Sequence, residues 1–463
     1  MSSWSENQPQ PVWLAVIHVG ALILLLAVYF LASKRARARR AHYSAVYEEL
    51  SNGAADNLLA DSRGLREKQS KSKLFTYADV GGQLLKYDVD KTTSWQVLFH
   101  LGGTVAAHPA VLWHVTLYYA VAFLAFGVEQ LIVRCDLGIP LLRLVSLSAV
   151  SQYFTSFIGI LLGFYISTVM GRWWSIRNDT LGSLWGAVDD LCLLMGAHFP
   201  GKDWRDVRTL VLRYSLASFE LIFMQAQGTD SELWRLEKRK LLTADEVAKL
   251  QDTPSRPQAI WTWVAWIFHE LHEQGHVSDI MLQLFYSKCT QARGGIGGIL
   301  AYLTCQLPWA YVHLLACMVH LMCTIVAIDV GLSNSRYVTA FVDPDDAPEH
   351  GPLVKMIQLV LTTFFYTGCM ELGRALTDPL GNDFEDFPRH AYVYWMWQEA
   401  EAFHSTNEEP VLACQETVKR MALRQQEQTE QKEQKELKEQ KEQEMLNSLE
   451  ALAVDGVQLH LQL

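Results

Sequence analysis

Residues 144–171 read LVSLSAVSQYFTSFIGILLGFYISTVMG, and no Asp, Glu, Lys or Arg interrupts them before Arg172. An α-helix needs about 20 predominantly apolar residues to cross the hydrocarbon core of a bilayer. The stretch is long enough for one crossing, so it predicts a membrane-spanning helix and decides the fold class.

Four further stretches are apolar enough to span a bilayer: residues 12–32, 111–133, 296–328 and 353–376. The first is followed at 34–40 by the basic sequence KRARARR. Under the positive-inside rule, this order predicts an uncleaved signal-anchor with residue 34 onward in the cytosol. A cleaved signal peptide is the less favoured alternative, because its basic residues would precede the apolar run.

The number of spans then fixes the side of each connection. Residues 172–293 and everything after 377 are expected in the cytosol, and the link 332–352 outside. That link carries four acidic residues and one basic residue, Asp343, Asp345, Asp346, Glu349 and Arg336. This bias agrees with the predicted topology. Apolar residues recur at helical spacing within 172–293, which predicts an all-α cytosolic region.

Composition supports a membrane protein with soluble parts. Charged residues make up 19% of the 463 residues, below the roughly 25% usual in soluble domains. The net charge of −11, without a basic patch, argues against a nucleic-acid partner.

We expect a signal-anchor and basic stretch at 1–40, a cytosolic linker at 41–74, a core unit at 75–402, and a low-complexity Gln/Glu/Lys-rich tail at 403–463. A solvated helix or a disordered tail is favoured over a coiled coil there.

One side of the predicted span at 144–171 has two interpretations. Phe157, Ile160 and Phe164 lie at helical spacing, and Ser156 continues their face. Such a face usually contacts lipid or packs on another helix. Alternatively it lines a pore constriction, because hydrophobic constrictions gate by dewetting and aromatic edges, which carry partial positive charge, can face an anion.

The sequence TDPLGNDFEDF at 377–387 places four carboxylates close together directly after an apolar span. It is either an acidic linker or a calcium site, since calcium takes carboxylate and carbonyl oxygens as ligands. The spacing is not that of an EF-hand.

A second candidate metal site is the histidine face of His269, His272 and His276. The HExxH zinc pattern is absent, so a packed or solvated face is the favoured interpretation.

Two motifs resemble those of the bestrophins, a family of pentameric, calcium-activated anion channels. Leu162-Gly163-Phe164-Tyr165 followed by Arg172-Trp173-Trp174 is similar to the family's second-helix signature, and residues 378–387 resemble its calcium clasp. A looser likeness runs from about residue 75 to about 402. The resemblance implies an all-α membrane protein: a homopentamer with four core spans per chain, here with an extra N-terminal span and a helical cytosolic domain.

The resemblance also implies roles for particular residues. Ser156, Ile160 and Phe164 fall on the pore neck, and Ile280 falls on a cytosolic aperture. The side chains of Asp378, Asp383 and Asp386 fall on the clasp, where Ala375 and a residue near 80–82, taken as Gly82, would contribute backbone carbonyls. Two departures matter: Ser156 and Ile160 replace bulkier or more apolar neck residues, and Phe384 stands where the family has a carboxylate.

The function expected from this resemblance is passive conduction of chloride, with bicarbonate as a further candidate, through a central pore under the control of bound calcium. No catalytic residue is expected. The membrane is expected to be the plasma membrane, with an organelle membrane as the alternative, and the C-terminus is expected in the cytosol. The alternative is a non-conducting scaffold or regulatory subunit with a structural calcium site. A third hypothesis, a membrane metalloenzyme, depends on the histidine face.

Overall fold

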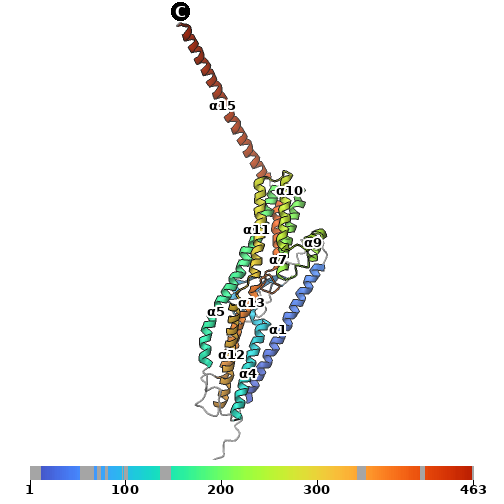
Figure 1. The fold of residues 1–463 in the computed structure, drawn as a ribbon, viewed down its shortest axis with the longest axis vertical. Helices are drawn as coiled ribbons and strands as arrows, with labels where there is room; N and C mark the ends of the chain where they lie inside the picture. The colour runs from blue at the N-terminus through green and yellow to red at the C-terminus, as the bar shows by residue number, and fades with distance from the viewer. Residues whose placement is uncertain are drawn as a thin grey trace, which may run out of the picture. The chain divides into compact units, whose positions relative to one another are not determined.

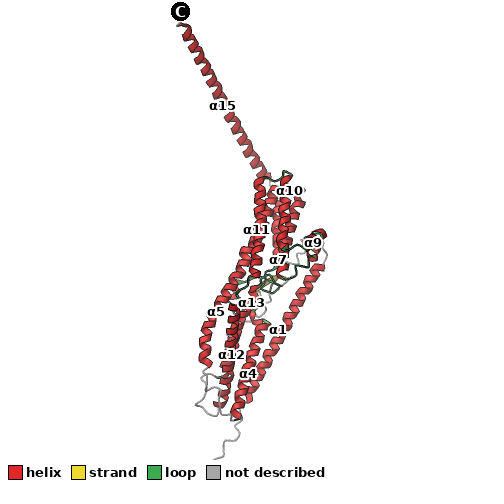
Figure 2. Ribbon diagram, viewed as in Figure 1, coloured by secondary structure: helices red, strands yellow, loops and turns green. Residues whose placement is uncertain are grey.

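The computed structural model describes residues 12–52, 67–69, 74–78, 82–95, 97, 103–135, 147–340, 351–406 and 412–460. The chain divides into two compact units: residues 1–191 with 209–400, and residues 192–208 with 401–463. Helices dominate the first unit (Figure 2). Of the predicted outer link 332–352, residues 332–340 belong to the helix that ends at Ala340, and the part at 341–350 with the four acidic residues lies outside the described residues.

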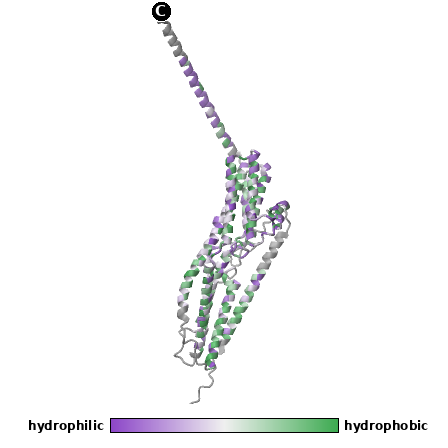
Figure 3. Cartoon of the chain, viewed as in Figure 1, coloured by the Kyte–Doolittle hydropathy of each residue, from purple (hydrophilic) through white to green (hydrophobic). Residues whose placement is uncertain are grey.

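Five helices in the described part of the chain are long and apolar enough to cross a membrane. These are α1 (Val12–Asn52), α4 (Pro109–Arg134), α5 (Leu147–Ser175), α12 (Trp309–Ala340) and α13 (Pro352–Thr377). Figure 3 shows hydrophobic residues concentrated along them. The expected helical membrane architecture and the extra N-terminal span are therefore confirmed.

The membrane helices pack around α12, which lies against α4, α5 and α13, while α1 packs on α4. Their core is made of buried aliphatic and aromatic side chains, including Ile158, Leu162, Leu315, Val319 and Leu359. Where two helices approach most closely, a glycine is needed. A Cβ at Gly331 of α12 would overlap the Ala122 carbonyl of α4, so small residues permit the contact.

The region predicted to be cytosolic is helical, as expected. Its elements are a π-helical turn (Ile176–Leu181), α6 (Gly182–His198), α7 (Arg205–Ala226), α8 (Trp234–Lys238), α9 (Ala244–Gln251), α10 (Arg256–Glu273), α11 (Asp279–Thr304) and α14 (Arg389–Thr406). Several of these helices are labelled in Figure 1. The tail forms one helix, α15 (Leu412–His460), whose described side chains are exposed. This agrees with the solvated-helix interpretation of the tail.

Two features differ from the sequence-based expectation. The apolar run 296–328 is not one span, because α11 ends at Thr304 and α12 begins only at Trp309. Pro308 lacks an N–H group and suits the start of a new helix, so the membrane-spanning segment is Trp309–Val338. Hydropathy alone could not reveal this break.

A small sheet is the second difference. Strands β1 (Glu67–Gln69), β2 (Phe75–Ala78) and β3 (Leu84–Tyr87) form an antiparallel sheet in the order β1-β2-β3. They occupy the end of the predicted linker and the start of the core unit, where only helix or linker was expected. The strands have three or four residues each, too short for an alternating pattern to be recognised. Short helical turns follow at α2 (Val89–Thr92) and at Val105–Ala107.

Candidate functional site

The predicted neck residues lie on one exposed side of α5. Ile160 is 61% exposed and Phe164 is 65% exposed, and Ser156 is also exposed. The opposite side of the same helix, which includes Ile158 and Leu162, is buried in the core. In a single chain, the neck side of α5 therefore has no packing partner among the described residues, and it is available to line a pore, to contact lipid or to contact another subunit.

The predicted aperture residue, Ile280, is the second residue of α11 and is 80% exposed. Ser278 caps the helix, its side chain accepting a hydrogen bond from the Met281 N–H. A cap of this kind fixes where the helix begins. The Ile280 side chain is therefore presented to solvent from a defined position in the chain.

The acidic turn forms a compact loop around Asp386, which is only 4% exposed. The Asp383 N–H donates a hydrogen bond to Asp386 Oδ2 at 2.5 Å. Gly381 lies so close that a Cβ there would come within 2.5 Å of the same oxygen. The loop thus holds one buried carboxylate, Asp386, beneath the exposed Asp383.

Backbone carbonyls border the same loop. Ala375 lies in the last turn of α13, and the residue four positions on is Pro379. Because proline has no N–H, the Ala375 carbonyl cannot make the usual helical hydrogen bond and is available as a ligand. On the sheet side, the Leu84 N–H donates to the Phe384 carbonyl at 2.9 Å, which joins the segment after Gly82 to the clasp loop.

The electrostatics of the loop favour a cation. Burial raises the pKa of Asp386 to about 7, and the charges of Asp383, Asp378 and Glu385 act in the same direction. Burial also raises the pKa of Glu385. A carboxylate whose pKa rises through desolvation and like charges is stabilised by a bound cation. The donor set of two carboxylates and nearby carbonyls fits calcium.

Among the described residues, no three His, Cys, Asp or Glu side chains come together as a metal cage. The clasp side chains would therefore need the backbone carbonyls to complete a calcium site. The result also removes the basis for a metal on the histidine face. His272 instead has Nδ1 2.8 Å from the Val277 carbonyl, and the His269 ring lies tilted against Trp266, with the ring centroids 5.3 Å apart.

Contacts that the sequence did not indicate join the neck helix to the clasp. The ring of Tyr165 on α5 fills the space beside Gly373 of α13, where a Cβ would overlap it. Farther along α5, the Trp173 and Phe387 ring centroids are 5.0 Å apart. One helix therefore carries the predicted neck residues and also contacts α13 just before the acidic loop and Phe387 at the end of that loop. Sequence spacing could not reveal these pairs, which are more than 200 residues apart.

Phe384 has a structural role that explains its presence among carboxylates. Its ring lies 5.2 Å from the ring of Phe75 in β2, in an edge-to-face arrangement. It also covers Gly103, where a Cβ would lie 2.8 Å from the ring. Gln227, just after α7, donates to the carbonyls of Leu380 at 2.8 Å and Gly381 at 3.2 Å. The loop is thus attached to the sheet by an aromatic ring and to α7 by hydrogen bonds.

Comparison with known proteins agrees with this arrangement. Residues 93–394 match the family model described as "Bestrophin, RFP-TM, chloride channel". Bestrophin homolog 22 of Caenorhabditis elegans is 26% identical over 238 residues, which cover 49% of this chain and 44% of that protein. Human Bestrophin-1 is 26% identical over 243 residues, covering 50% and 39% respectively. The chain thus spans about half the length or less of these curated relatives.

The fold has counterparts among solved structures. A bacterial bestrophin homolog from Klebsiella pneumoniae superposes with a TM-score of 0.53 at 21% identity, covering 64% of this chain and 98% of the other. The family match contains the neck face and the acidic loop and excludes α1 and the small sheet. Since the match covers well over half of the chain, the protein belongs to the bestrophin family.

Proposed function

We propose that this protein is the subunit of a calcium-dependent anion channel that assembles as a homopentamer around a central pore. Chloride, and bicarbonate as a second small anion, would pass the neck formed by Ser156, Ile160 and Phe164. They would then pass the aperture at Ile280. The observation that carries the proposal is the exposed side of α5, which carries the three predicted neck residues, while Ile158 and Leu162 on the opposite side are buried in the core.

The chemistry of the exposed α5 side suits a gated anion path. Ile160 and Phe164 would form a hydrophobic constriction, which excludes ions when it is dry. The edges of five Phe164 rings would present partial positive charge to an anion. The hydroxyl of Ser156 adds a hydrogen-bond donor at this neck, so we expect a neck that hydrates more readily than an all-apolar one.

The acidic loop is the proposed calcium site. Asp383 and Asp386 would supply carboxylates, Ala375 and Gly82 would supply backbone carbonyls, and Asp378 would add negative charge from the start of the loop. When bound, calcium would neutralise this acidic cluster. Because Trp173 contacts Phe387 and Tyr165 contacts Gly373, the state of the loop can act on the neck helix.

For topology, we propose that the acidic loop and the C-terminal tail face the cytosol of a cell whose plasma membrane holds the channel. The support is the order of α1 and the basic residues 34–40, which favours residue 34 onward on the inner side. Protease protection of epitopes placed in the tail and in the link 341–350 would test this orientation.

The channel hypothesis can be tested with purified protein in planar bilayers. We expect the reversal potential to follow the chloride gradient when sodium is replaced by a large organic cation. Phe164→Ala should raise the conductance, because it widens the constriction. The matched control Phe365→Ala, at a residue 57% exposed on α13, should leave it unchanged.

Two results would contradict the proposal. A reversal potential that follows the cation gradient would exclude anion selectivity. Protein that binds calcium and forms pentamers but never conducts would favour the scaffold alternative.

A further inference from the structure

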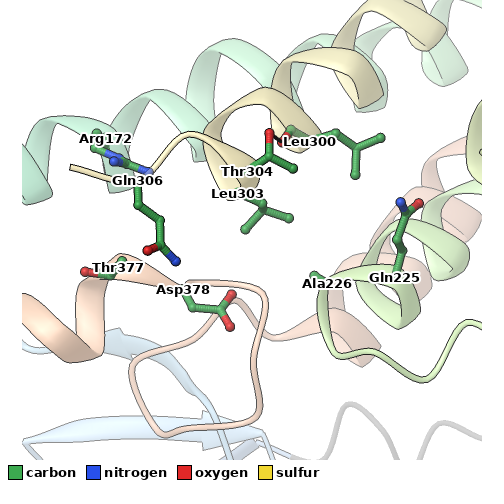
Figure 4. A pocket seen from close by; sticks show the side chains of 9 residues that line it. All are labelled: Arg172, Gln225, Ala226, Leu300, Leu303, Thr304, Gln306, Thr377 and Asp378. Atoms are coloured by element: carbon green, nitrogen blue, oxygen red, sulfur yellow. Dashed lines mark hydrogen bonds between the residues drawn. The ribbon is translucent and has the colours of Figure 1, made fainter. Parts of the chain in front are cut away.

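A cavity of about 310 Å³ lies beside the acidic loop. Its walls include Arg172 near the end of α5, Gln306 in the link before α12, and Thr377 and Asp378 at the end of α13. The last turn of α11 and the end of α7 complete the walls (Figure 4). The cavity is therefore expected at the depth of the lipid headgroups, where apolar helices give way to polar ones.

The cavity carries both signs of charge. Arg172 from the end of α5 and Asp378 from the end of α13 line it, together with the amides of Gln306 and Gln225. Figure 4 shows the Asp378 carboxylate and the Gln306 side chain extending toward the enclosed space. The Arg172 guanidinium is oriented by donating from Nη2 to the Tyr302 carbonyl at 2.6 Å, which uses one of its five N–H donors.

These residues select a particular ligand chemistry. A guanidinium matches phosphate geometry, whereas a carboxylate accepts hydrogen bonds from a primary ammonium group. Quaternary ammonium groups are instead bound by aromatic cages, and none of the nine residues that line the cavity is aromatic. Leu300 and Leu303 add an apolar wall that can receive the carbon atoms of a glycerol backbone or of an acyl chain.

We propose that this cavity binds a phosphate group joined to a primary ammonium group, as in the headgroup of phosphatidylethanolamine. Arg172 holds the phosphate, and Asp378 with Gln306 holds the ammonium. The proposal is independent of conduction, since it concerns a lipid site on the subunit. It also gives Asp378, at the start of the acidic loop, a ligand outside the proposed calcium site.

The test is native mass spectrometry of the detergent-purified full-length protein, titrated with phosphatidylethanolamine, phosphatidylcholine and phosphatidylglycerol of identical acyl chains. We expect phosphatidylethanolamine to bind at least tenfold more tightly than the other two. Arg172→Gln should lower that affinity about tenfold, and Asp378→Asn should remove the preference over phosphatidylcholine. Ala226→Leu, which fills the cavity without changing charge, should abolish binding. Arg134→Gln, at the opposite end of the spans, serves as the matched control.

A competition experiment distinguishes a membrane lipid from free O-phosphoethanolamine as the ligand of this cavity. Free O-phosphoethanolamine should displace the lipid only weakly, because it lacks the apolar contacts of Leu300 and Leu303. If the free compound binds as tightly as the lipid, the assignment to a membrane lipid is overturned. Equal binding of the three lipids, or unchanged binding to the Ala226→Leu protein, would overturn the site itself.

Discussion

Removal of the proposed calcium ion should make the stability of this protein depend on pH partly through the buried carboxylate of Asp386. Burial, with smaller contributions from Asp383, Asp378 and Glu385, raises the pKa of Asp386 to about 7, from about 3.8 for the unperturbed group. The native state therefore holds a proton that the unfolded chain has released between about pH 4 and pH 7. Over this window the free energy of unfolding falls by about 1.4 kcal/mol per pH unit for each subunit, and the fall reaches about 4 kcal/mol above pH 7.

The assay is thermal unfolding followed by intrinsic tryptophan fluorescence, in chelator and in calcium, from pH 5 to pH 8. In chelator, the wild-type midpoint should fall as the pH rises, and calcium should reverse most of that fall because the ion neutralises the ionised carboxylate. Asp386→Asn should remain stable at pH 8 without calcium, since it carries no charge to desolvate. Asp252→Asn, at an exposed aspartate outside the membrane-spanning helices, is the control for a simple change in net charge.

Two outcomes would refute this reasoning. The first is a wild-type midpoint that rises with pH in chelator, which would mean that the Asp386 carboxylate is stabilised in its ionised form by the protein alone. The second is an Asp386→Asn protein that keeps the full wild-type dependence on pH, which would assign that dependence to other groups.

Three further predictions concern packing. Gly373→Ala should lower the free energy of unfolding by roughly 1–3 kcal/mol, because the added methyl group overlaps the ring of Tyr165. The double variant Gly373→Ala/Tyr165→Leu should restore that stability. Phe384→Asp should lower the thermal midpoint in chelator, because the ring over Gly103 is lost, while calcium affinity measured by titration rises. His18→Leu should lower the free energy of unfolding by about 1 kcal/mol, since it removes the 3.0 Å contact with the Tyr119 hydroxyl. An unchanged thermal unfolding midpoint would mean that this contact does not stabilise the packing of α1.

The membrane architecture was predictable because long charge-free runs have few alternative structures. A run such as residues 144–171 cannot be solvated and must cross a bilayer or be buried. The break after Thr304 was not predictable by the same means, because Gln306 is the only strongly polar residue in the link 305–308 and one amide hardly changes a hydropathy average. The three short strands were missed because their pairing is set by partners along the chain and not by a local pattern.

The candidate site was predictable in its residues but not in its connections. The carboxylate spacing and the resemblance identified Asp383 and Asp386 as candidates, and their calcium role stays a prediction. The contact of Trp173 with Phe387 and the Gly373–Tyr165 pair arise only when α5 and α13 pack together. A sequence without aligned relatives carries no signal for such pairs, because each residue alone resembles ordinary helix packing.

The way the acidic loop is held bears on what calcium can do there. Gln227 donates to the Leu380 and Gly381 carbonyls, and Phe384 is fixed by β2 and by a backbone hydrogen bond from Leu84. None of these contacts needs a cation. We therefore expect the acidic loop to keep its conformation when the proposed calcium ion is absent. The main change expected on loss of the proposed calcium ion is then the uncompensated charge around Asp386, next to Phe387 and its contact with Trp173 of α5. Protonation of Asp386 relieves the same charge, so low pH and calcium should act on the neck in the same direction.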